Sequence, residues 1–186
     1  MKRMLSLILI FSVFLCAVLS GCQGKSTYSI SPDLLMALFG QEPSDFLLTE
    51  RRWYKNVGID LRECASIDRS GNLILKLNNN EKEKVLTYYD NDLDKLDSLP
   101  QVEILEQYKV LKITGTKVSV SDIIANEFGL LTIHEMAIRQ LFSGVSSDDV
   151  SVTVIVEDEG TNAIVYEATW PKEDINLSVN NWQFSG

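Results

Sequence analysis

Three aspartates, Asp90, Asp92 and Asp94, have the first, third and fifth positions of a calcium-binding loop. Such a loop has a glycine at its sixth position and a bidentate glutamate at its twelfth, where this chain has Lys95 and Gln101. The same residues also extend a helix, which would direct the three carboxylates to different sides of its axis. We therefore expect a solvated helix face here and no bound metal.

The sequence holds a single histidine, His134, within an apolar stretch that also contains Glu135. We interpret it as a histidine of the core or its edge and not as a base or ligand. No HExxH, CxxC, G-x-S-x-G or glycine-rich phosphate motif occurs in the chain. No catalytic residue and no cofactor are therefore assigned, although a hydrolase that uses carboxylates stays the alternative.

The N-terminus has the layout of an export signal. Two basic residues precede an apolar run over 4–19, which is shorter than the roughly 20 residues of a spanning helix. Small residues and Cys22 follow this run. An uncleaved membrane helix and a secretory signal cut without lipidation are the alternatives to the interpretation below.

The tetrapeptide Leu19-Ser20-Gly21-Cys22 resembles the lipobox of bacterial lipoproteins. The resemblance covers the first 22 residues and implies that a diacylglyceryl group is attached to the Cys22 thiol. It also implies cleavage before Cys22, so that acyl chains hold the protein on the extracytoplasmic side of the cell membrane. The rest of the chain resembles small exported lipoproteins without an assigned function.

Removal of residues 1–21 leaves 165 residues, enough for one domain with a core of its own. It takes away two basic residues and no acidic one, so the net charge changes from −9 to −11. This charge argues against nucleic acid as a partner and against attraction to anionic lipid. Cys64 is then left without an intramolecular disulfide partner, and we expect it to be buried in a strand.

One basic and aromatic cluster, Arg51, Arg52, Trp53 and Lys55, stands out in this acidic chain. Its cations could face lipid phosphates with Trp53 among the headgroups. The other interpretation is a helix end whose aromatic residues lie in the core.

The domain boundaries that we expect are a signal peptide at 1–21, a lipidated tether at 22–31 and one globular domain at 32–186. Apolar periodicity and turn residues predict an α+β domain of two layers, with a largely antiparallel sheet of hairpins and two main helices on one face. The expected helices are 32–39, 43–54, 81–96 and one from Ser119 or Ser121 to Phe142, and the expected strands are 59–67, 72–77, 102–106, 108–114, 150–156 and 163–170, before a C-terminal loop.

These features predict a non-catalytic binding domain displayed on the membrane. A sheet edge, or a surface at Trp170 and Trp182, could receive a protein segment or a glycan. A binding domain would present an open edge or patch, whereas a hydrolase would present a cavity with convergent polar groups.

Overall fold

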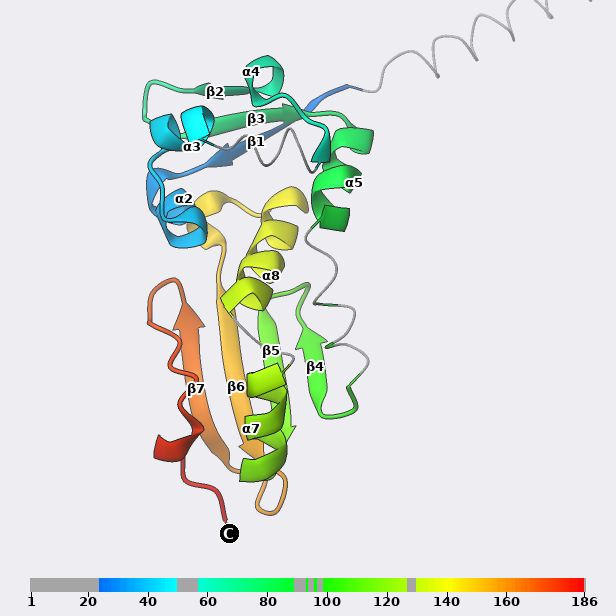
Figure 1. Cartoon of the computed structure of the whole chain (residues 1–186), viewed down its shortest axis with the longest axis vertical. Helices are drawn as coiled ribbons and strands as arrows, with labels where there is room; N and C mark the ends of the chain where they lie inside the picture. Colours follow the sequence, from blue (N-terminus) through cyan, green and yellow to red (C-terminus); the bar gives the residue numbers. More distant parts are fainter. Residues whose placement is uncertain are drawn as a thin grey trace, which may run out of the picture.

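The computed structural model describes residues 24–49, 57–88, 93, 96, 99–126 and 130–185, which form an α+β fold (Figure 1). The predicted fold class is confirmed. The strands, however, form two sheets: a three-stranded antiparallel sheet in the order β1-β3-β2 and a four-stranded mixed sheet in the order β4-β5-β6-β7. The expectation of one sheet of hairpins is therefore wrong.

The strands are β1 (Ser26–Ile30), β2 (Ala65–Ile67), β3 (Leu73–Leu77), β4 (Val102–Leu105), β5 (Val110–Gly115), β6 (Val152–Asp158) and β7 (Ile164–Trp170). The helices are α2 (Pro32–Phe39), α3 (Pro43–Thr49), α4 (Leu61–Cys64), α5 (Asn79–Tyr88), α7 (Lys117–Asn126) and α8 (Leu130–Phe142), with the short 3-10 helices η2 (Ser147–Asp149) and η3 (Val179–Asn181).

The first strand, β1, lies inside the segment that was expected to be a tether. Its residues pair with β3 along the whole strand, from Ser26 opposite Leu77 to Ile30 opposite Leu73. Tyr28 and Ile30 point into the core, while Thr27 and Ser29, which alternate with them, stay exposed. This alternation is typical of a half-buried strand. The predicted tether at 22–31 is therefore wrong for its second half.

Side chains cap the N-termini of two helices. The Ser31 hydroxyl accepts a hydrogen bond from Leu34 N–H at the start of α2. Before α5, Asn78 and Glu81 form a reciprocal capping box, in which each side chain accepts the other residue's N–H at 2.9 and 2.8 Å.

The segment 59–67, expected to be one strand, is divided between a helical turn and a strand. Asp60 caps α4 by accepting the N–H of Arg62 at 3.0 Å, so the chain turns before it enters β2. Cys64 ends α4 with its side chain buried. Its predicted burial is confirmed, although it does not lie in a strand.

Two helices connect β5 to β6, where the sequence predicted one. Thr116, and neither expected serine, caps the first of them, α7, by accepting Ser119 N–H at 3.2 Å. Because the connection crosses over through α7 and α8, β6 returns parallel to β5. Helical crossovers of this kind join parallel strands, and hairpins cannot.

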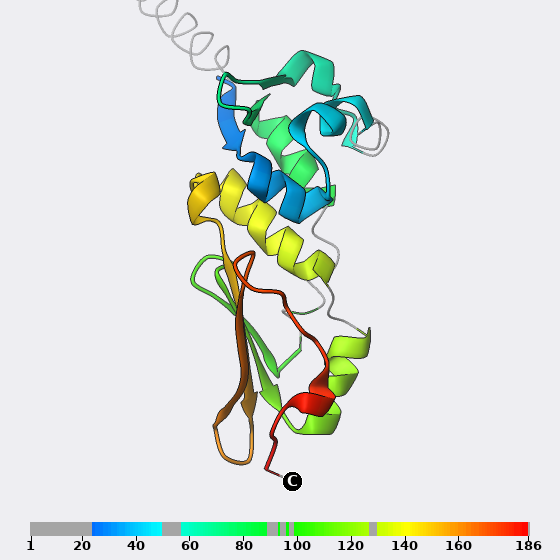
Figure 2. The same ribbon diagram turned by 90° about the vertical axis from the view of Figure 1, so that its left-hand side faces the viewer.

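Helix α8 lies between the two sheets (Figures 1 and 2). Its side chains are buried almost all round, which fits its largely apolar sequence. Near its C-terminus, the Phe142 ring contacts Tyr28 of β1 edge-on, with 4.6 Å between the ring centroids. Gly144 then ends the helix with φ of 97°, and Val145 N–H closes the cap on Gln140 O.

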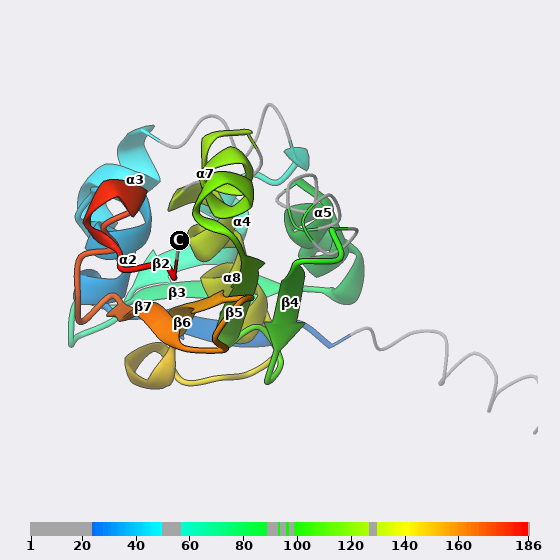
Figure 3. The same cartoon turned by 90° about the horizontal axis from the view of Figure 1, so that it is seen from below.

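The four-stranded sheet is covered on one face. Figure 3 shows α7 and the C-terminal segment on the same side of it. Trp182 stacks on Tyr166 of β7 at a centroid distance of 4.5 Å, and Trp170 is also buried. The expected ligand surface at Trp170 and Trp182 is therefore wrong, because Trp182 packs the C-terminal segment onto β7 and Trp170 is buried against His134 of α8.

Within the described residues, no helix is long and apolar enough to cross a membrane.

Candidate functional site

A polar pocket of about 280 Å³ lies between β1 and the turn that follows α8. One wall comes from Thr27, Ser29 and Ser31, at the edge of β1 and the start of α2. The facing wall runs from Gly144 to Asp148, the segment that links α8 to β6. The remaining lining residues are Tyr28, Asn72 and Leu141. The pocket is rich in hydroxyl groups that can donate and accept hydrogen bonds.

Hydrogen bonds between Ser31 and Ser147 hold the two walls together at one end. The Ser31 N–H donates to Ser147 Oγ at 2.7 Å, and the Ser147 hydroxyl donates to Ser31 Oγ at 2.9 Å. Ser31 also caps α2, so its side chain has one defined orientation. A helix cap therefore fixes each of the two walls: Ser31 caps α2 in one wall, and Gly144 caps α8 in the other.

The ionisable lining groups of the pocket are the Asp148 carboxyl and the Tyr28 phenol. Asp148 is exposed, and Asp149 follows it in η2. The pocket lining therefore combines one exposed carboxylate with several neutral hydroxyl groups.

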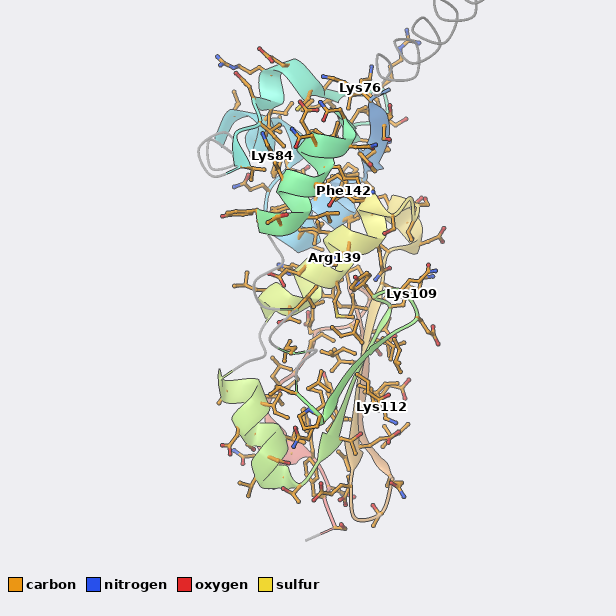
Figure 4. All side chains as sticks on the ribbon, turned by 90° about the vertical axis from the view of Figure 1, so that its right-hand side faces the viewer. Lys76, Lys84, Lys109, Lys112, Arg139 and Phe142 are labelled. Carbon is orange, nitrogen blue, oxygen red and sulfur yellow. The ribbon has the colours of Figure 1, made fainter. Side chains whose placement is uncertain are left out.

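A second open surface is the outer face of the four-stranded sheet, opposite α7 and the C-terminal segment (Figure 2). Lys112 on β5 and Glu157 on β6 form an ion pair at 2.9 Å on this face. The hydrogen bond to Glu157 raises the pKa of Lys112. On the same face, farther along β6, the hydroxyls of Thr153 and Thr169 lie 3.0 Å apart. The labelled lysines Lys76, Lys84, Lys109 and Lys112 are spread over the length of the molecule (Figure 4).

A buried amide joins α8 to the four-stranded sheet. Gln140 is fully buried, and its Nε2 donates to Tyr108 O and Ser151 O at 2.7 Å each. Its Oε1 accepts Ser151 N–H at 3.3 Å. One helical turn before Phe142, the guanidinium of Arg139 lies over the Tyr108 ring at 5.1 Å (Figure 4). Because its amide is engaged with the backbone, we assign Gln140 to the structure of the core.

The turn from β4 to β5 has an unusual backbone conformation, and Gln140 is one of the residues that stabilise it. Glu106, Gln107 and Tyr108 all have positive φ, between 52° and 71°. Left-handed backbone costs a residue with a Cβ roughly 1–2 kcal/mol. The two backbone hydrogen bonds donated by Lys109 N–H, and the bond from Gln140 to Tyr108 O, stabilise this turn.

His134 is half-buried and lies against Trp170, with 5.6 Å between ring centroids. It does not line the pocket. Burial lowers the pKa of His134 below its ordinary value. The interpretation of His134 as a histidine at the edge of the core is confirmed.

His134 should make the fold sensitive to mild acid. Its folded pKa is lowered, so below about pH 6.5 the unfolded chain binds a proton that the folded chain does not, and stability falls as the pH falls. We expect the Tm of the wild type to decrease more between about pH 7.5 and pH 5.5 than that of His134→Gln. Thermal unfolding monitored by circular dichroism measures both slopes, and equal slopes would exclude this role for His134.

The buried thiol of Cys64 also lies away from the pocket. Burial, and next the charge of Glu81, raise its pKa, which disfavours the reactive thiolate.

The residues that the sequence analysis considered for lipid attachment, membrane contact or calcium binding lie outside the described part of the chain. This holds for Cys22, for the cluster of Arg51, Arg52, Trp53 and Lys55, and for Asp90, Asp92 and Asp94. Within the described ranges, no group of three or more His, Cys, Asp or Glu side chains is arranged to hold a metal ion. The structure instead identifies a pocket whose residues the sequence did not single out.

Comparisons with family models, with curated proteins and with solved structures each find no match to this chain.

Proposed function

We propose that the protein is an exported lipoprotein, held on the extracytoplasmic side of the membrane by a lipid on Cys22, whose domain binds a partner without chemical turnover. The observation that carries the binding role is the polar pocket between β1 and the turn after α8. The partner is a protein segment or a glycan of the cell envelope.

The position of β1 supports display close to the membrane. Ser26, the first residue of β1, is four residues after Cys22 in the sequence. An extended chain covers about 3.5 Å per residue, so this link reaches about 14 Å. A lipid on Cys22 would therefore keep β1, and the pocket beside it, near the bilayer surface.

The chemistry of the pocket supports binding in preference to hydrolysis. Hydrolysis by carboxylates requires two of them with different protonation states, one on each side of the scissile bond. Asp148 is the carboxylate in the lining, and the other polar side chains there are hydroxyls and the Asn72 amide. Such groups orient a ligand by hydrogen bonds. The carboxylate hydrolase stays the alternative.

Site-specific crosslinking in the native membrane tests this function. A photoreactive amino acid at Ser146, on the pocket wall, should yield a discrete crosslinked species in intact cells. The matched control is Val118 on α7, which is 70% exposed and does not line the pocket. Absence of any product at Ser146, or the same products at both positions, would contradict a partner at this pocket.

A further inference from the structure

We propose that the pocket receives a short, extended peptide segment with a basic residue, which adds to the free edge of β1 as a further strand. This inference rests on the proposed binding function and specifies its partner, but it does not depend on the lipid anchor. It follows from the direction of the β1 backbone groups, from the size of the pocket and from its charge.

The hydrogen bond between Asp68 and Asn72 fixes which way the backbone of β3 points. Asp68 N–H donates to Asn72 O at 3.0 Å, so the peptide groups of Asn72 face β2. In an antiparallel sheet these groups alternate sides along a strand, and those of Leu73, Leu75 and Leu77 therefore face β1.

The residues of β1 that pair with these leucines are Ile30, Tyr28 and Ser26. Residues directly opposite each other either exchange both hydrogen bonds or none. The backbone N–H and C=O of the two residues between them, Thr27 and Ser29, must therefore point away from β3, toward the free edge.

Ser31 gives an independent check of this direction. It continues the alternation of Thr27 and Ser29, and its N–H donates across the pocket to Ser147. Thr27 and Ser29 line the same pocket. Among the described residues, none forms a hydrogen bond with the backbone of Thr27 or Ser29 on this side. An added strand would supply these missing partners.

The size of the pocket limits the partner to a short segment. Ligand pockets have volumes of about 300–1,000 Å³, and this pocket, at about 280 Å³, is at the lower limit. Thr27 to Ser29 spans about 7 Å at the rise of a strand. The bond between Ser31 and Ser147 closes the far end, so the added segment pairs with two residues of β1.

The charge of the pocket selects a basic residue. Asp148 is the acidic lining group, and Asp149 adds a second exposed carboxylate beside it. The chain as a whole carries a net charge of −9. A lysine or arginine on the added segment would lie near these carboxylates, whereas an acidic segment would be repelled.

The first test uses peptides and the full-length protein in detergent. The affinities of capped pentapeptides of the form Thr-Val-Xaa-Val-Thr, in which Xaa is each of the standard amino acids in turn, are measured by fluorescence anisotropy. We expect the tightest binding with Lys or Arg at Xaa. N-methylation of single amides should lower the affinity about tenfold at alternate positions and less than about twofold at the positions between them, because only alternate amides face β1.

The second test changes the free edge of β1 and keeps its pairing with β3. Ser29→Pro removes an N–H that faces the pocket, and we expect about a tenfold loss of affinity for the best peptide. Ser29→Ala keeps that N–H and removes only the hydroxyl, so it should lower the affinity clearly less than Ser29→Pro does, and the difference between the two variants measures the contribution of the backbone N–H. Ile67→Pro is the matched control, since Ile67 is on the other edge strand and its N–H also points away from β3.

Asp148→Asn tests the charge. It should reduce the affinity for the Lys peptide about fivefold and leave that of a neutral peptide unchanged.

The inference is overturned if no peptide binds, if N-methylation at every amide has the same effect, or if Ser29→Pro and Ile67→Pro behave alike. If Ser29→Pro does not fold, the binding of the N-methylated peptides to the wild-type protein still tests the strand addition. If the peptides fail while Ser146 crosslinks a partner, the strand addition is wrong and the binding function stands.

Discussion

Replacing Gln140 with leucine lowers the free energy of unfolding by about 3 kcal/mol, since it leaves half-buried backbone groups of Tyr108 and Ser151 without their hydrogen-bond partner. The Gln140 amide is bonded to Tyr108 O, Ser151 O and Ser151 N–H, and its side chain is fully buried. Leucine is of similar size, so the change does not open a cavity. It removes the hydrogen bonds and replaces none of them.

A loss of this size should lower the Tm by about 6–12 °C, because a chain of this length shifts by about 2–4 °C for each kcal/mol. Thermal and urea unfolding measure it. Leu131→Ala is the control on the same helix, since Leu131 is 67% exposed and should change stability by less than about 0.5 kcal/mol. A loss below about 1 kcal/mol for Gln140→Leu would contradict the buried amide as a link between α8 and the sheet.

Most helices and strands were predictable because their signals are local. Ser31, the pair of Asn78 and Glu81, and Gly144 define helix ends through hydrogen bonds and backbone conformations that involve nearby residues. The pairing of β4 with β5 and of β6 with β7 likewise depends on short turns. Such interactions can be read from a few consecutive residues.

The division into two sheets was not predictable from these patterns. An apolar strand has the same sequence pattern whether it pairs with a neighbour in a hairpin or with a strand that lies beyond a helix. The path of α7 and α8 makes β6 parallel to β5, and the strand sequences alone do not show this path. The role of Trp182 was hidden for a similar reason. An aromatic residue in a polar tail has the same sequence pattern whether it contacts a ligand or, as here, Tyr166.

The candidate site was the least predictable part of the chain. The segment 23–31 reads as polar, although the alternation of Tyr28 and Ile30 with Thr27 and Ser29 is the pattern of a half-buried strand and could have identified β1. The opposite wall runs from Gly144 to Asp148. Ser147 in this wall and Ser31, to which it is hydrogen-bonded, are 116 residues apart in the sequence. No local signal reports a contact over that separation.

Replacing Cys22 with alanine should release the protein from membranes. Two acyl chains bury enough methylene groups, at about 0.8 kcal/mol each, to anchor a protein stably, whereas a single myristoyl chain binds reversibly. The acidic chain offers no general attraction to anionic lipid. We therefore expect nearly all of the wild type in the membrane fraction after an alkaline wash, and nearly all of Cys22→Ala in the soluble fraction.

Cys22→Ser serves as the matched variant, because serine keeps the size and polarity of the side chain without a thiol to lipidate. It should behave as Cys22→Ala does. Quantitative immunoblotting of the two fractions measures the distribution. Retention of both variants in the membrane would assign the attachment to the cluster of Arg51, Arg52, Trp53 and Lys55, or to an uncleaved segment 1–21.

The most direct test of the lipid anchor, on which the proposed display at the membrane depends, is the intact mass of the wild-type protein extracted from membranes. We expect a chain that begins at Cys22 and carries the added mass of a diacylglyceryl group on that residue. A mass that still includes residues 1–21, or an unmodified Cys22, would contradict it.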